Sequence, residues 1–342
     1  MTTNRTPPVS DTQPVVRQRH WRWPIPTYLY LAGMGAGAYT IGVIMSWLGF
    51  ADAPPHWLLF WGSLLVVLGA PFLILDLGQK LRFLSAARNP WTSWMSRGFA
   101  ILSSCIVLGL ANFAIALSWE ALPWLAQHTS IVLTVPGWLS NGSAFVLAVQ
   151  VAGLLAAVGT ALYTGIFLQS VRYISLWHTP LLPLLFLVSA LSTGSMLTVV
   201  SVIGYAGVAG TVYPTHLVET ITRLEQIFLV VEAMVLLAYL LQRYRTDIAV
   251  RTSVRLMVAG SLRFVFWGGI VACGFVFPVV FEAAYSQLPD YRMLLFLSGV
   301  SVLIGGFFLR YAIVSAGVKE RHPLERMVGV KFGFTPPLKS NE

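Results

Sequence analysis

An acidic residue, Asp76, stands at the end of a long apolar run, and Lys80 and Arg82 follow it within two helical turns. A carboxylate beside an apolar segment is costly unless it is paired or hydrated, so such a residue indicates a functional site. The simpler interpretation is an ion pair with Lys80, with the lysine extended toward the lipid headgroups. We treat Asp76 as a candidate for proton exchange.

A second set of charges, Arg223, Glu225 and Glu232, lies in the apolar run at 222–242. The two glutamates are seven residues apart, so they share one face of a helix. Glu232 precedes Arg243 by eleven residues, which places it about 16 Å from that end of the helix. A carboxylate at that depth is more typical of a proton path than of a structural role. We therefore predict a proton path through these three residues and the serine-rich run before them.

Other candidates gather near the same predicted membrane surface as Asp76. Tyr163 lies at a similar depth, and a buried phenol needs a hydrogen-bond partner. Tyr28 fits an interfacial anchor as well as a ligand contact, and Gly33 fits plain helix packing as well as close approach of a ligand. His178 and Arg310 fall at the same surface.

The composition is that of a multi-pass membrane protein. The chain has 342 residues, of which 56% are hydrophobic and 10% charged, and its mean hydropathy is +0.74. The net charge of +9 lies in the connections and indicates orientation rather than nucleic-acid binding. Cys105 and Cys273 are too few for an iron–sulfur cluster or a structural zinc, which take about four ligands. None of the six histidines falls in the middle of an apolar run, which argues against a bound haem.

Eight apolar runs are long enough to span a bilayer, which predicts an all-α integral membrane protein with eight transmembrane helices. We place them at 28–50, 57–79, 97–119, 143–168, 180–205, 222–242, 263–285 and 292–315. We expect a flexible N-terminal tail at 1–24, an eight-helix transmembrane domain at 25–318 and a cytoplasmic tail at 319–342. Residues 120–141 are predicted to form an interfacial loop with an aromatic belt.

The loop charges predict the orientation. All Lys and Arg residues except Arg223 and Arg292 fall on one side, and the positive-inside rule therefore places both termini in the cytoplasm. The acidic residues assigned to the other side are Asp52, Glu120, Glu219, Glu282 and Asp290. The basic connections 80–97 and 243–263 fit either a docked partner protein or anionic lipid.

A faint repeat relates the two parts of the chain. Pro26 with Gly33-x-Gly35-x-Gly37 corresponds to Pro183 with Ala190-x-Ser192-x-Gly194 at an offset of 157, and Asp76 corresponds to Glu232 at an offset of 156. The offset spans four helices, so the repeat is parallel rather than inverted. It predicts two four-helix halves.

Several motifs, taken in order, resemble the membrane-subunit family of polysulfide reductase (NrfD/PsrC). Those of the first half are Trp23-Pro24 with Tyr28-Leu-Tyr-Leu-Ala-Gly-Met-Gly-Ala-Gly, Leu75-Asp-Leu-Gly with Arg82-Phe83, Ser93-x-x-Ser96-Arg-Gly98 and Tyr163-Thr-Gly165. Those of the second half are Leu182-Pro-Leu-Leu-Phe-Leu-Val-Ser189-Ala-Leu-Ser-Thr-Gly194, Arg223-Leu-Glu225 with Glu232, and Leu309-Arg310-Tyr311 with Ala316-Gly317. The resemblance covers all eight predicted helices.

The resemblance implies a subunit that binds menaquinone or ubiquinone and carries no haem or iron–sulfur cluster of its own. It implies a quinone site near the start of the first helix, with Tyr163 and Asp76 at the motif positions. We extend the expected site to Tyr28, Gly33, His178 and Arg310. The sequence departs from the family in two respects. Position 28 is Tyr, where relatives can carry His. The face with the expected site is basic and therefore predicted to be cytoplasmic, whereas relatives with external partners should have this face outside.

We therefore expect the quinone-reactive membrane subunit of a respiratory oxidoreductase, in the cytoplasmic membrane of a bacterium or archaeon. The expected partners are an iron–sulfur electron-transfer subunit on the cytoplasmic face, a molybdopterin or other catalytic subunit behind it, and membrane lipid. Two alternatives stay open. A proton-coupled secondary transporter also uses intramembrane carboxylates, and a passive membrane anchor would leave Asp76 and Glu232 without a purpose.

Overall fold

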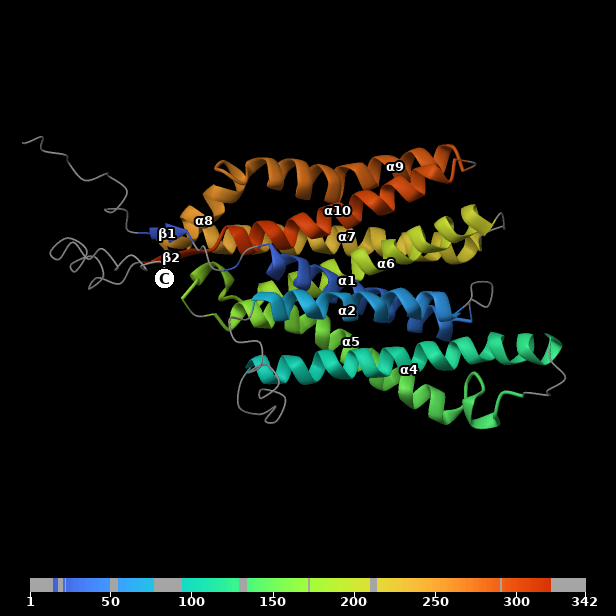
Figure 1. The fold of residues 1–342 in the computed structure, drawn as a ribbon. Coiled ribbons are helices and arrows are strands. Elements are labelled where there is room, and N and C mark those ends of the chain that lie inside the picture. The colour runs from blue at the N-terminus through green and yellow to red at the C-terminus, as the bar shows by residue number, and fades with distance from the viewer. Residues whose placement is uncertain are drawn as a thin grey trace, which may run out of the picture.

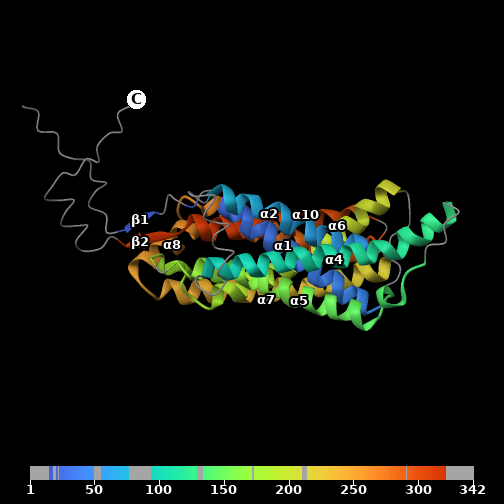
Figure 2. The same ribbon diagram turned by 60° about the horizontal axis from the view of Figure 1, so that its bottom comes forward.

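The chain forms an elongated bundle of helices that run side by side (Figure 1, Figure 2). The computed structural model describes residues 15–17, 21, 23–49, 55–76, 94–128, 134–171, 173–209, 214–289 and 291–320. Its long helices are α1 (Pro24–Trp47), α2 (Pro55–Asp76), α4 (Trp94–His128), α5 (Ala144–Gln169), α6 (Leu181–Ala209), α7 (Thr215–Tyr244) and α10 (Met293–Ser315). The remaining helices are α8 (Ile248–Val258), the π-helix η4 (Val265–Val276), its continuation α9 (Phe277–Gln287), and the short η2 (Gly137–Leu139) and η3 (Ser175–Trp177).

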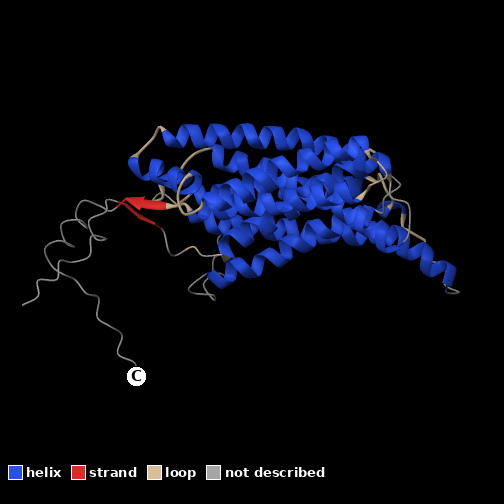
Figure 3. Cartoon of the chain, turned by 90° about the horizontal axis from the view of Figure 1, so that it is seen from above, coloured by secondary structure: helices blue, strands red, loops and turns tan. Residues whose placement is uncertain are grey.

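Seven helical stretches of the described residues are long and apolar enough to cross a membrane, η4 and α9 together making one of them. The prediction of an all-α membrane protein is confirmed at this level (Figure 3). The apolar part of α2 within the described residues, Leu59–Leu73, is shorter than a span. The count of eight therefore stays a prediction.

The structure differs from the prediction at two connections. The helix placed at 97–119 continues as α4 to His128, because a helix satisfies its own backbone hydrogen bonds and so can extend beyond the hydrocarbon region. The basic connection 243–263 contains α8, an amphipathic helix that buries Val250, Val254 and Met257 and exposes Arg251 and Arg255. Apolar length alone missed α8 because half of its surface is polar.

A small antiparallel sheet joins the two ends of the described residues. Strand β1 (Val15–Arg17) pairs with β2 (Val318–Glu320), with Val16 opposite Lys319. The sequence does not predict this pairing. It places both ends at one end of the bundle, next to α8, and we call this the strand end (Figure 1). The other end is called the opposite end.

The two central helices, α1 and α6, approach each other closely through small residues. A Cβ atom at Gly37 would overlap the Ala190 carbonyl, and one at Gly194 would overlap the backbone of Gly37 and Ala38. Gly37 and Gly194 are the positions that the sequence repeat equates. Helix α1 also packs on α2 and α5, and α6 packs on α7 and α10, so the order of neighbours recurs as expected for two related halves.

The close contact of α1 and α6 leads to a stability prediction. Gly194→Ala should destabilise the protein by about 1–3 kcal/mol, because the added methyl group meets backbone atoms that cannot move aside alone. The matched control is Gly207→Ala on the same helix, where the added Cβ atom has nothing within 4 Å. Thermal melting of the purified protein, followed by size-exclusion chromatography, compares them. Equal melting temperatures would contradict the close packing.

Candidate functional site

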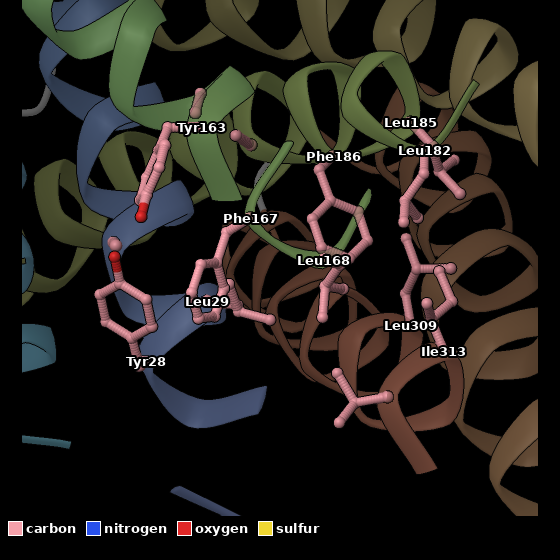
Figure 4. Close-up of a cluster of buried hydrophobic side chains, with 14 of the residues drawn as sticks. Tyr28, Leu29, Tyr163, Phe167, Leu168, Leu182, Leu185, Phe186, Leu309 and Ile313 are labelled. Carbon is pink, nitrogen blue, oxygen red and sulfur yellow. The ribbon is translucent and has the colours of Figure 1, made fainter. Parts of the chain in front are cut away.

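Two tyrosine hydroxyls face each other in the strand-end half of the bundle. Tyr28 on α1 and Tyr163 on α5 are both buried, and Figure 4 shows their hydroxyl groups pointing toward one another. Among the residues that the structure describes, the buried Tyr28 hydroxyl has no hydrogen-bond partner. A buried phenol without a partner is unfavourable. The Tyr28 hydroxyl is therefore free, within this part of the chain, to bind a ligand.

A set of stacked aromatic rings and a glycine lie next to Tyr163. Trp21 stacks on Phe167 with ring centroids 5.3 Å apart and on Trp177 at 5.0 Å, and Tyr163 lies 6.0 Å from Phe167. A Cβ atom at Gly98 of α4 would overlap the Tyr163 ring. The absence of a side chain at Gly98 therefore leaves space for the Tyr163 ring. The flat rings nearby suit a flat aromatic ligand.

The predicted proton exchanger, Asp76, is the last residue of α2, and its side chain lies outside what the structure describes. Its part of α2 runs beside the start of α1. The rings of Trp23 and Phe72 are 5.8 Å apart, and a Cβ atom at Gly69 would lie 3.6 Å from the Tyr28 carbonyl oxygen. The backbone at Asp76 is therefore at the strand end, beside the helix that carries Tyr28.

Arg310 on α10 belongs to a different part of the interior. Its guanidinium is fully buried and donates to Ser189 Oγ at 2.9 Å, the Gly306 carbonyl at 3.0 Å and the Phe186 carbonyl at 3.5 Å. A Cβ atom at Gly33 would lie 2.9 Å from Arg310 Nη2, so this glycine makes room for the arginine. Tyr30 covers the guanidinium at 5.6 Å.

Glu232 on α7 lies next to this arginine. Its carboxyl is within hydrogen-bonding reach of Ser189 and Ser192 and near the Arg310 charge. Ser189 thus bridges the two charged groups. A cavity of about 10 Å³ beside Glu232, bounded by Thr193 and Gly306, has the minimum size for one water molecule.

The acids continue from Glu232 toward the opposite end. Ser192 Oγ donates to Glu225 Oε1 at 3.4 Å, and the Glu225 carboxyl is within hydrogen-bonding reach of Glu282 on α9. Glu282 accepts from Gln226 Nε2 at 2.9 Å and from Ser298 Oγ at 2.8 Å. We call this series the acid chain, and its members from the strand end are Arg310, Ser189, Glu232, Ser192, Glu225 and Glu282.

The acid chain reaches an open cavity of about 290 Å³ at the opposite end. Its walls include Glu282 and Gln226, together with the exposed side chains of Glu219 and Arg223. The prediction grouped Arg223 with the buried acids, whereas the structure places it on the exposed wall of this cavity. The acid chain thus runs from a buried arginine to a space wide enough for several waters.

The structure brings only some of the predicted site residues together. Tyr28 and Tyr163 meet. Gly33 instead lies against Arg310, which is close to Glu232. His178 is exposed, with its Nδ1 atom 3.3 Å from the Gln169 carbonyl. Its neighbour Trp177, by contrast, is buried.

The sequence predicted Glu282 only as one of the charges of the far side of the membrane and not as a site residue. The structure places it buried and hydrogen-bonded inside the bundle, beside the cavity at the opposite end. A signal was present, because Glu282 falls within the apolar run predicted at 263–285. Ser298 and Gln226, its donors, have no signal of their own in the sequence.

The residues that the structure describes contain no group of three or more His, Cys, Asp or Glu side chains able to hold a metal ion. The groups available for chemistry among these residues are phenols, carboxyls, hydroxyls and a buried guanidinium. Such groups bind a polar organic ligand and move protons.

Comparison with known proteins adds a family context. Residues 11–319 match the family described as polysulphide reductase, NrfD. The C subunit of the polysulfide reductase of Wolinella succinogenes is 28% identical over 315 residues, which cover 87% of the present sequence and 94% of that protein. The NrfD protein of Escherichia coli is 27% identical over 317 residues, and an NrfD homolog of Haemophilus influenzae is 23% identical over 311 residues, with the same shares covered.

Proposed function

Because the chain belongs to the polysulfide reductase NrfD family of respiratory membrane subunits, we propose that it exchanges electrons between membrane quinones and a partner subunit. The observation that carries this proposal is the unpartnered Tyr28 hydroxyl facing Tyr163 among stacked aromatic rings. A quinone carbonyl accepts hydrogen bonds, and it would give the Tyr28 hydroxyl the partner that it lacks among the described residues.

The quinone, when bound, supplies the electron-transfer chemistry, and the protein supplies position and protons. Tyr163 donates to one carbonyl oxygen and Tyr28 assists from the facing helix. The ring of Phe167 and the indole of Trp21 exclude water and favour a flat headgroup. Asp76 exchanges the coupled proton directly or through one water, since proton transfer requires that reach.

Family membership supports a proposal for the partner subunits. The relative in Wolinella succinogenes is named as one subunit of a polysulfide reductase, which supports a multi-subunit complex here. We infer an iron–sulfur electron-transfer subunit, joined to a molybdopterin or other catalytic subunit, at the strand end where the tyrosine pair lies. The loop charges favour a cytoplasmic location for this end, in a bacterial or archaeal cytoplasmic membrane. A reporter fused after Glu342 that is active only in the periplasm would contradict this orientation.

The acid chain supports an additional activity, proton translocation. Glu225 and Glu232 lie between the Arg310 region and the open cavity that Arg223 lines, with Ser189 and Ser192 between them. Hydroxyls next to carboxyls relay protons over short steps. We infer that protons move along this series toward the opposite membrane face while quinone reacts at the strand end.

The function is tested on the whole complex purified from native membranes through an affinity tag on this subunit. We expect extracted quinone in about equimolar amount, an iron–sulfur subunit in the same particle, and oxidation or reduction of a short-chain naphthoquinone or benzoquinone. A quinone-binding-site inhibitor should stop that reaction. A complex that holds its partners but neither binds nor converts quinone would contradict the proposal and favour a passive anchor.

Replacing Glu232 tests the proton path. Glu232→Gln should at least halve the number of protons released per electron in proteoliposomes, because an amide cannot exchange a proton. Quinone binding should stay unchanged, since the tyrosine pair is elsewhere. The control is Asp247→Asn, an exposed acid at the start of α8. Unchanged proton stoichiometry would show that Glu232 only packs against Arg310.

A further inference from the structure

Glu225 on α7 and Glu282 on α9 form a carboxyl pair inside the membrane-spanning bundle. Glu225 has no exposed surface and Glu282 only 8%. Each side chain is within hydrogen-bonding reach of the other. Two residues 57 positions apart thus place acidic groups against each other where water is largely excluded.

The hydrogen-bond donors around the pair are unequally shared. Glu282 receives two, from Gln226 Nε2 and Ser298 Oγ. Glu225 receives one, from Ser192 to its Oε1 atom, and its buried Oε2 atom has no donor in the part of the chain that the structure describes. An oxygen of this kind is costly to leave unsatisfied. A proton held between the two carboxyls would supply the missing donor.

No neighbouring positive charge among the described residues compensates the Glu225–Glu282 pair. Among the described residues, no Lys or Arg side chain acts on either carboxyl as a neighbouring charge. Arg310 lies at Glu232, and Arg223 is exposed on the cavity wall. Two ionised carboxylates in contact at low dielectric repel each other strongly, so such pairs hold one proton between them.

We propose that Glu225 and Glu282 share a single proton and that Glu282 passes it between the acid chain and the open cavity at the opposite end. The proposal rests on the proton path inferred above and adds its outermost member. Glu282 is suited to this role because it touches both sides: it meets Glu225 within the bundle and lines the cavity of about 290 Å³. Glu225 itself does not line that cavity.

The transfer needs no other reactant. The O–H bond of the Glu225 carboxyl breaks as one forms on Glu282, which was the ionised partner, and Glu225 takes up the negative charge. Glu282 then releases the proton to a water in the cavity, and Glu225 is reprotonated from Glu232 through Ser192. The transfer from Glu225 to Glu282 leaves the net charge of the pair unchanged at minus one.

Infrared spectroscopy of the purified complex tests whether the proton is shared. The wild-type protein should show a carboxylic-acid C=O band that shifts in deuterated water. Glu225→Gln and Glu282→Gln should each remove the same band, because the remaining glutamate then accepts from the new amide and stays ionised. Glu219→Gln, which alters an exposed acid on the same cavity, should keep it.

The alternatives give different spectra. A band lost only in Glu225→Gln, or only in Glu282→Gln, would show a proton that belongs to one residue and would overturn the sharing. A band unaffected by both variants would also overturn it. Glutamine preserves the size of the side chain, and size-exclusion chromatography of the assembled complex verifies that each variant folds.

Proton release in proteoliposomes tests the transfer role. Glu282→Gln should reduce proton release at the opposite face about tenfold, while Asp247→Asn leaves it unchanged. Unreduced proton release in Glu282→Gln would overturn the role of Glu282 as the outermost member. If wild-type complex releases no protons at all, the proposed path fails, whereas the infrared result still decides whether the pair shares its proton.

Discussion

Tyr163→Phe should lower quinone-linked turnover at least tenfold while the complex stays assembled. The phenyl ring keeps its packing against Gly98 and Phe167, so only the hydroxyl is lost. Hydrogen bonding or proton donation by a positioned group contributes about 10²–10⁴-fold to such reactions. The rate of oxidation of a short-chain naphthoquinol and a benzoquinol, normalised to the amount of assembled complex, measures the effect.

The matched control is Tyr239→Phe at the same end of the bundle. The Tyr239 hydroxyl is buried and donates to the Leu176 carbonyl at 3.0 Å, so its loss affects stability rather than turnover. Asp76→Asn should reproduce the Tyr163→Phe loss if that carboxyl exchanges the coupled proton. Wild-type rates in both Tyr163→Phe and Asp76→Asn would remove the quinone site from this part of the bundle.

Arg310→Gln should destabilise the folded protein by about 3 kcal/mol or more. The guanidinium is fully buried, makes three hydrogen bonds and offsets the Glu232 charge through Ser189. Removing one member of a buried charge pair leaves the other uncompensated, which typically costs about 3–5 kcal/mol. Yield and melting temperature of the purified protein measure the loss.

A second substitution identifies the cause of the Arg310 effect. Arg310→Gln combined with Glu232→Gln should be more stable than Arg310→Gln alone, because no unpaired charge remains. Arg251→Gln, an exposed arginine whose guanidinium lies 5.6 Å from the Tyr244 ring centroid, should leave the melting temperature nearly unchanged. A double variant no more stable than the single one would show that Arg310 acts by packing and not by its charge.

The amino-acid sequence alone determined the class of the protein and several of its site residues. Long apolar runs specify membrane helices because a backbone in lipid must satisfy its own hydrogen bonds. For the same reason a charge inside such a run is visible without a structure, and Glu225 and Glu232 were found that way. Arg310, by contrast, was expected at the membrane surface, and the structure buries it. The ordered motifs from Trp23 to Gly317 also indicated the family to which the protein belongs.

Tertiary structure decided which of these residues meet. Tyr28 and Tyr30 are two positions apart on α1, so they point to different sides of the helix, one toward Tyr163 and the other toward Arg310. Gly33, three residues after Tyr30, lies on the same side of α1 and makes room for Arg310 of the acid chain. Hydropathy is nearly uniform around a membrane helix, so it does not reveal which face meets which neighbour.

The partners of the buried acids were equally undetermined by sequence. Glu282 meets Glu225 because the fold brings the two side chains together at that depth, and the number of residues between them carries no such information. Close contacts at Gly37 and Gly194 fix how α1 and α6 sit together, and the other helices pack around this centre. The length of an apolar run places a residue at a certain depth in the membrane. Close backbone contact between small residues decides which helix faces meet, and so which acids and which tyrosines become neighbours.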